Sequence, residues 1–244
     1  MLSTQAPRVS TCCLRLQPFT SCTETASKRT LAWVKTLVIG KNLCPFAAAP
    51  LNAGSLRIKV SAAETDSSAL DEIESEIDLL FPAATLSTLP TQSTSSSSTN
   101  TTTTTTPTTT LIVFPNHKKL VESHPHQVKL GYDILARISQ NNNNKSSSSL
   151  QIVNFHPRGQ HSLYAPPDEI SLETDDPYNF VTRSPYPTVH LLRTVDLVDA
   201  SKFMSNDTEK IPLRNMERLR KDGRDQLLQE WNEISQQQDK NKIT

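Results

Sequence analysis

Thr110-Leu-Ile-Val-Phe114 is a short continuous apolar run, and the fold prediction starts from it because it indicates a strand. Residues 56–61, in which apolar and polar side chains alternate, and residues 150–155 predict two further strands. Residues 66–81 show the apolar spacing of an amphipathic helix, and residues 117–139 show it in their second half. The order strand, helix, strand, helix, strand predicts parallel pairing through right-handed crossovers.

We therefore expect an α/β fold: a single compact domain with a small, mostly parallel sheet of three or more strands flanked by helices. Three more helices are predicted outside this core. The first covers residues 31–39 and has Thr30 as its N-cap. The second covers residues 188–203, after a proline-rich segment, and the third covers residues 212–235 and carries many charges.

Two low-complexity tracts, one of Ser and Thr and one of Asn and Ser, interrupt the predicted domain. Neither offers apolar atoms to bury, so we expect disordered inserts at about 85–109 and 140–149. The expected domain then spans 30–235, with a disordered tail at 236–244. Residues 1–29 are basic, rich in hydroxyl groups and poor in acids. That composition fits an organelle transit peptide or an ordinary disordered terminus.

Charge and composition exclude several classes of protein. The 25 basic and 25 acidic residues cancel, so the overall charge indicates neither a nucleic-acid partner nor an anionic lipid surface. No apolar run is long enough for a membrane span, and with five glycines no phosphate-binding loop occurs. Three of the four cysteines lie before residue 30, which fits a reducing, intracellular compartment: cytoplasm, plastid or mitochondrion. No cofactor and no oligomeric state is indicated.

Three candidate catalytic residues, Cys44, His156 and His190, lie in short polar segments that contain prolines. His156 directly follows a predicted strand, where ligands of parallel α/β sheets bind. Cys44 needs a nearby imidazole to become a thiolate nucleophile. The alternatives are a buried apolar cysteine, a capping histidine at 156 and a hydrogen-bonded core histidine at 190.

Two arginines are the candidate anion ligands. Arg183 lies just before the predicted helix 188–203, and Arg193 would share a helix face with His190. The alternative for both is a structural ion pair with a nearby aspartate. The further substrate-binding candidates are Asn42, Asn179, Ser184 and Tyr186. No metal is expected, because no pair among the candidate ligands has the short spacing typical of zinc sites.

Three segments resemble the signature blocks of a known family. They are Trp33-Val-Lys-Thr-Leu-Val-Ile-Gly-Lys-Asn-Leu-Cys-Pro-Phe-Ala47, Asn154-Phe-His-Pro157 and residues 179–193. The sequence resembles domain of unknown function family 1415, which is largely bacterial, from about Leu31 to about Leu219. The resemblance implies a compact domain and transfers no reaction. The last block departs from the family pattern at Phe180, Val181 and Thr182, where the family has an amide at the position of Thr182.

Two functions from different classes follow from these residues. The first is a small hydrolase or transferase for an anionic small molecule, in which arginines hold the anion and His156 transfers a proton. The second is a non-catalytic binding domain for a phosphate-bearing ligand. Both require the segments around positions 44, 156 and 183–193 to meet at one site.

Overall fold

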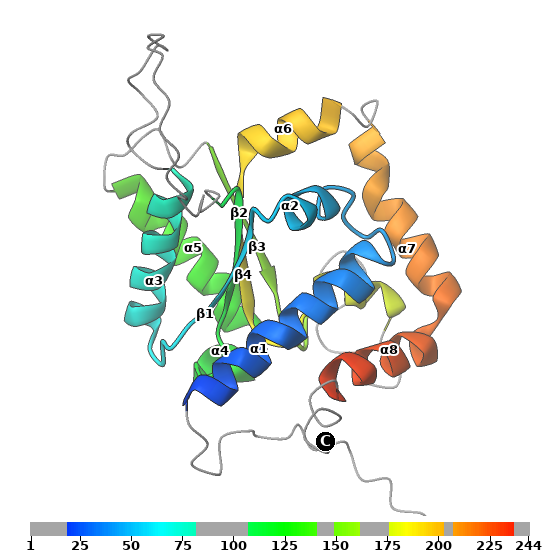
Figure 1. Cartoon of the computed structure of the whole chain (residues 1–244), viewed down its shortest axis with the longest axis horizontal. Coiled ribbons are helices and arrows are strands. Elements are labelled where there is room, and N and C mark those ends of the chain that lie inside the picture. The colour runs from blue at the N-terminus through cyan, green and yellow to red at the C-terminus, as the bar shows by residue number, and fades with distance from the viewer. Residues whose placement is uncertain (1–18, 82–106, 141–148, 162–175, 203–206, 237–244) are drawn as a thin grey trace, which may run out of the picture.

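The structure is a computed structural model that describes residues 19–81, 107–140, 149–161, 176–202 and 207–236. A four-stranded sheet stands at its centre, with helices on both faces (Figure 1). The two predicted inserts fall largely outside the described residues, as do most of the tail at 236–244 and residues 1–18.

The sheet is mixed. Its strands are β1 (Leu56–Val60), β2 (Thr109–Val113), β3 (Leu150–Phe155) and β4 (Thr188–Arg193), in the order β1-β2-β4-β3. β1 and β2 pair in parallel, whereas β4 is antiparallel to both β2 and β3. The expected α/β class is confirmed, but the expected mostly parallel pairing is wrong. β4 returns in the reverse direction and separates β2 from β3.

The predicted helix over 188–203 is also wrong in its first half. Residues 188–193 form β4, and helix α6 (Thr194–Lys202) begins only afterwards. β4 lies between two strands and carries apolar side chains on both faces, so its short apolar run has no alternation that would mark a strand. The consequence concerns the site: His190 and Arg193 point to opposite faces of the sheet.

One face of the sheet, here called the α3/α5 face, is covered by α3 (Asp66–Leu80) and α5 (His124–Gln140), with the short α4 (Lys118–Glu122) beside them. Thr65 caps α3 through a reciprocal pair of hydrogen bonds with Ser68. The side chains between these helices and the strands are mostly aliphatic and almost fully buried, among them Ile73, Ile112, Ile134 and Leu191.

On the opposite face, here called the α1/α7 face, α1 (Phe19–Trp33) packs on β1 and β2 and continues as the π-helix η1 (Val34–Ile39). α7 (Ile211–Asp222) and α8 (Arg224–Gln236) lie farther from the strands on this side, where α8 packs on α1 (Figure 1). The 3₁₀ helix η3 (Pro177–Thr182) packs against α7. The short α2 (Ala48–Asn52) and the 3₁₀ helix η4 (Asp207–Lys210) complete the described elements. The hydrophobic core on the α1/α7 face includes Trp33, Leu37, Leu111, Leu219 and Leu227.

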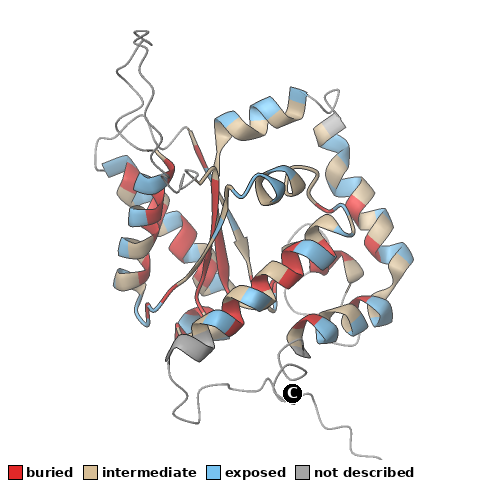
Figure 2. Cartoon of the chain, in the orientation of Figure 1, coloured by how far each residue is buried: buried red, intermediate tan, exposed pale blue. Residues whose placement is uncertain are grey.

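Two predicted boundaries change. α1 begins at Phe19, so residues 19–29 belong to a helix rather than to a tail, and Thr25 and Ala26 in it are buried. The predicted helix over 212–235 is broken at Gly223, whose φ of 81° suits glycine because it has no Cβ. Figure 2 shows buried residues along the sheet and on the helix surfaces that face it.

Candidate functional site

A cavity of about 750 Å³ lies against the α1/α7 face of the sheet. α1 packs on β1 and β2, and the cavity extends from there over β4 and β3. Its wall comes from the strands, from η1 and the turn after it, and from η3, α6 and α7. Aliphatic and aromatic side chains make up most of the lining. Among the described lining residues none is Asp, Glu, Lys or Arg.

The floor of the cavity is the exposed part of β3 and β4. Val153 of the edge strand β3 is 37% exposed, although its neighbour across the ladder is His190 of the inner strand β4. Both side chains line the cavity together with Leu192 and Phe155. Val153 is exposed on the face that lines the cavity, so the described helices leave this part of the sheet open.

His190 of β4 and Gln151 of β3 are polar groups on this floor. Nε2 of His190 lies 2.7 Å from Oγ1 of Thr109, and that hydroxyl is also 3.0 Å from the carbonyl oxygen of Leu191. The surrounding protein lowers the pKa of His190 to about 4 by burial. The imidazole is therefore neutral at physiological pH.

Cys44 lines the same cavity from the turn that follows η1. Burial is the largest influence on its thiol and raises the pKa, although backbone hydrogen bonds from Phe46 and Ala47 and the charge of Arg214 oppose the change. The thiol is therefore protonated at neutral pH. The structure thus brings two predicted catalytic residues, Cys44 and His190, to one cavity, both in uncharged form.

The turn that carries Cys44 is fixed by α7. Asn42 adopts a φ of 49°, a conformation that asparagine tolerates better than most residues. Its carbonyl oxygen accepts from Arg214 at 2.8 Å, and the carbonyl of Leu43 accepts from Nδ2 of Asn215 at 2.7 Å. The predicted ligand residue Asn42 is exposed and contributes structure to the turn, and its side chain is not part of the cavity wall.

Lys41, at the start of this turn, reaches the other end of α7. Its Nζ donates to Asp222 at 2.8 Å and to Glu230 at 2.9 Å. Burial opposes the charge of Lys41, but the two carboxylates outweigh it and raise its pKa. The ion pairs therefore tie the turn to both C-terminal helices.

His156 lies on the opposite side of the sheet from the cavity. Phe155 points into the cavity, so the next side chain along the extended chain points to the α3/α5 face. His156 is fully buried there. Its Nε2 donates to the carbonyl of Leu120 at 2.8 Å, and its Nδ1 accepts from the backbone N–H of Arg158 at 3.0 Å. With both nitrogens occupied, and a pKa that burial lowers to about 4, it has the geometry of a structural histidine.

The two predicted anion ligands do not line the cavity either. Arg193 makes a two-pronged ion pair with Asp196, at 2.6 and 2.8 Å, which is the structural alternative considered from the sequence. Arg183 donates from Nε to the carbonyl of Gly159 at 3.3 Å, and its guanidinium lies 4.8 Å from the ring centre of Phe180.

The remaining predicted ligands connect neighbouring segments. Oδ1 of Asn179 accepts from the backbone N–H of His161 at 3.0 Å. Ser184 is buried and donates to the carbonyl of Tyr186, whose own hydroxyl accepts from Arg29 at 3.1 Å. None of these three candidates lines the cavity.

The predicted segments nevertheless meet. The backbone N–H of His156 donates to the carbonyl of Thr182 at 3.1 Å. Gly159 approaches the same carbonyl so closely that an added Cβ would lie 2.4 Å from its oxygen. Thr182 and His161 both line the cavity. The signature segments thus converge on one wall, while the side chains of His156, Arg183 and Arg193 point elsewhere.

Several lining residues escaped the sequence analysis. Thr109 fell inside the predicted insert 85–109 because it adjoins the Ser/Thr tract, yet it belongs to β2. Its β-branched side chain next to the apolar run was the available signal. Val153, Leu192 and Val198 gave no signal, since only the packing of the helices shows that they are uncovered.

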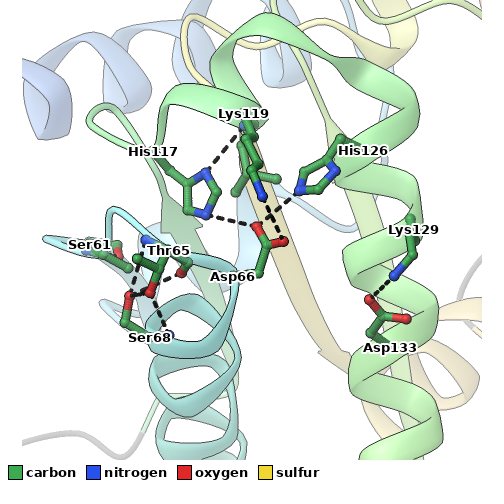
Figure 3. A network of polar contacts seen from close by, with 11 residues as sticks. Ser61, Thr65, Asp66, Ser68, His117, Lys119, His126, Lys129 and Asp133 are labelled. Atoms are coloured by element: carbon green, nitrogen blue, oxygen red, sulfur yellow. Dashed lines mark hydrogen bonds and ion pairs between the residues drawn. The ribbon is translucent and has the colours of Figure 1, made fainter.

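A second polar cluster lies beyond the carboxyl ends of β1 and β2. Oδ1 of Asp66 lies 2.9 Å from Nε2 of His126 and 3.2 Å from Nε2 of His117, and Lys119 approaches the other oxygen (Figure 3). The hydrogen bond with His126 lowers the pKa of Asp66 most strongly. His117, interpreted from the sequence as solvent-facing, is 1% exposed and caps α4. Within the described residues no group of three His, Cys, Asp or Glu is placed to hold a metal ion.

The fold and the cavity define an α/β domain with an open pocket of the size of a small molecule. A family model described as "Protein of unknown function (DUF1415)" matches residues 25–229, so the chain belongs to that family. No curated protein and no solved structure matches the chain. No helix among the described residues is long and apolar enough to span a membrane.

Proposed function

We propose that this domain binds a small, largely apolar molecule in the cavity over β3 and β4. The supporting observation is the combination of volume and lining. About 750 Å³ falls within the range of ligand pockets, which are mostly apolar and contain a few polar groups. Here the polar groups include His190, Thr109 and Cys44, set among aliphatic and aromatic side chains.

The lining favours an uncharged ligand over the anion that the sequence suggested. An ion moved into an apolar cavity without a partner loses its hydration, which costs several kcal/mol or more. Neither Arg183 nor Arg193 lines this cavity, and Arg193 is already paired with Asp196. The phosphate-binding alternative therefore lacks a supporting contact here.

A hydrolase or transferase is the second candidate, favoured by one observation: a thiol and an imidazole line the same cavity. Such a pair is the usual source of a cysteine nucleophile. Against it, the surroundings raise the pKa of Cys44 and lower that of His190, so both charged forms are disfavoured. Binding without covalent chemistry is the function that the geometry supports best.

The test compares two Val→Trp variants with the natural protein. Val153→Trp places a large ring in the cavity, and Val195→Trp adds the same ring on α6 at a position that is 54% exposed and outside the lining. Uncharged aromatic fragments are screened by thermal shift and by NMR. We expect fragments that bind the natural protein and the Val195 variant but not the Val153 variant. The proposal would be refuted if every binding fragment bound all three proteins equally, or if no fragment bound the natural protein.

A further inference from the structure

We propose that the ligand is an uncharged molecule that donates an O–H or N–H group to Nδ1 of His190, with Thr109 as the residue that positions the imidazole. This inference rests on the proposed function and specifies the chemical class of its ligand. It follows from the direction of two hydrogen bonds on the floor of the cavity.

The hydroxyl of Thr109 fixes which nitrogen of His190 carries the proton. A hydroxyl has one hydrogen to donate, and a carbonyl oxygen can only accept. Oγ1 of Thr109 lies 3.0 Å from the carbonyl oxygen of Leu191 and donates its hydrogen there. The contact of 2.7 Å with Nε2 of His190 then requires the imidazole to donate. Neutral His190 is therefore protonated on Nε2 and carries a lone pair on Nδ1.

The lone pair on Nδ1 is available to a molecule in the cavity. No hydrogen bond from the described part of the chain reaches this atom, and it is not one of the fully buried side-chain atoms without a partner. His190 belongs to an inner strand, and its ring lines the cavity. The exposed part of the ring therefore faces this space rather than bulk solvent.

An acceptor in this position selects among ligands. A neutral O–H or N–H group forms a hydrogen bond with Nδ1, whereas an ether or ester oxygen meets it with a second lone pair. A carboxylate or phosphate adds a charge that no described cation of the lining compensates. The apolar remainder of the ligand would contact Val153, Leu192 and Val198, which form part of the same wall.

The experiment uses the full-length chain and three probes that share a propylphenyl group: 4-propylphenol, its methyl ether 4-propylanisole, and 4-propylbenzoate. A phenol remains protonated at pH 7, because phenolic groups have a pKa of about 10. Dissociation constants are measured by NMR titration of methyl signals. We expect 4-propylphenol to bind roughly fivefold to tenfold more tightly than the ether, the effect of one hydrogen bond, and the benzoate to bind weakest.

Variants at the two positions separate the contact from mere packing. His190→Phe keeps an aromatic ring but removes the acceptor, so the preference for the phenol should disappear while the ether still binds. Thr109→Val removes the hydroxyl that holds the tautomer and should weaken the preference, and Thr109→Ser should restore it. The tautomer is followed directly in long-range ¹H–¹⁵N spectra of the imidazole, in which a structural role of Thr109 alone would leave the signals unchanged.

Each result decides one claim. If the natural protein binds neither the phenol nor the ether, the proposed function fails. Equal binding of the two overturns the donor inference and leaves the proposed function standing. A natural protein whose spectrum shows His190 protonated on Nδ1 also overturns the inference, whether or not the variants fold.

Discussion

The reactivity of Cys44 distinguishes a binding cavity from a cysteine enzyme. The thiolate, and not the thiol, is the nucleophile. Because burial raises the pKa of Cys44, we predict that the folded protein reacts slowly with iodoacetamide at pH 8 and that the pH of half-maximal reactivity lies above 9.

The size of the effect follows from the ordinary pKa of a cysteine thiol. With a pKa of 9.0, about one tenth of a thiol is ionised at pH 8. The raised pKa puts the ionised fraction of Cys44 in the folded chain below that value. A cysteine activated by His190 would behave in the opposite way, with a midpoint below that of the unfolded chain.

The assay requires that only one thiol reacts. A variant with Cys12, Cys13 and Cys22 replaced by serine leaves Cys44 alone, and alkylation is followed by mass spectrometry from pH 6 to pH 11. The same variant in concentrated urea gives the reference midpoint. The pH of half-maximal alkylation is the decisive quantity. Limited access of iodoacetamide to the thiol would slow the reaction at every pH but would leave this midpoint unchanged. A folded midpoint below the unfolded one would refute the electrostatic argument and make the enzyme the preferred function.

Three further predictions concern the scaffold around the cavity. Gly159→Ala should destabilise the fold by about 1–3 kcal/mol in urea titrations, because its Cβ would collide with the carbonyl of Thr182; an unchanged midpoint would contradict the close approach. Lys41→Met should cost about 2 kcal/mol at pH 7, since it leaves two partly buried carboxylates without their shared cation. Because the pKa of Lys41 is raised, the stability that its ion pairs contribute is complete below pH 10.5 and is lost as the pH rises beyond that value. If Lys41→Met lost stability at alkaline pH just as the natural protein does, the result would count against the ion pairs. The free energy of unfolding should fall as the pH drops from 7 to 4, because His156 and His190 take up protons in the unfolded chain but stay neutral in the folded one, where their pKa values are about 4. His156 alone accounts for a loss of at most about 3 kcal/mol. His190→Phe should reduce the slope of the unfolding free energy against pH. An unaltered slope in that variant would show that the folded protein does not lower the pKa of His190.

The elements with strong local signals could be predicted from the sequence. β3 spans residues 150–155 as expected, and α3 lies within one residue of the predicted 66–81, because its apolar spacing, its Thr65 cap and the following Pro82 all agree. β4 could not be recognised in this way. Its apolar run is as compatible with a helix as with an inner strand, and only its pairing with β2 and β3 distinguishes the two.

The meeting of the candidate segments could be predicted from the sequence, whereas the directions of their side chains could not. Residues of the segments around 44, 156 and 183–193 do line one cavity, but the alternation of side chains along an extended chain sends Phe155 into the cavity and His156 away from it. Which of the two faces holds the cavity depends on where α1 and α7 pack. Local sequence carries no information about that packing. The exposure of Val153 depends on the packing of these helices.

The cavity itself can be tested most directly by crystallography with 4-bromophenol, using the anomalous signal of bromine to locate the probe. The proposed function predicts a bromine peak in the space bounded by Val153, Leu192 and α6, with the phenol oxygen toward His190. Bromine found only at other positions, with the lining side chains packed against one another, would contradict it.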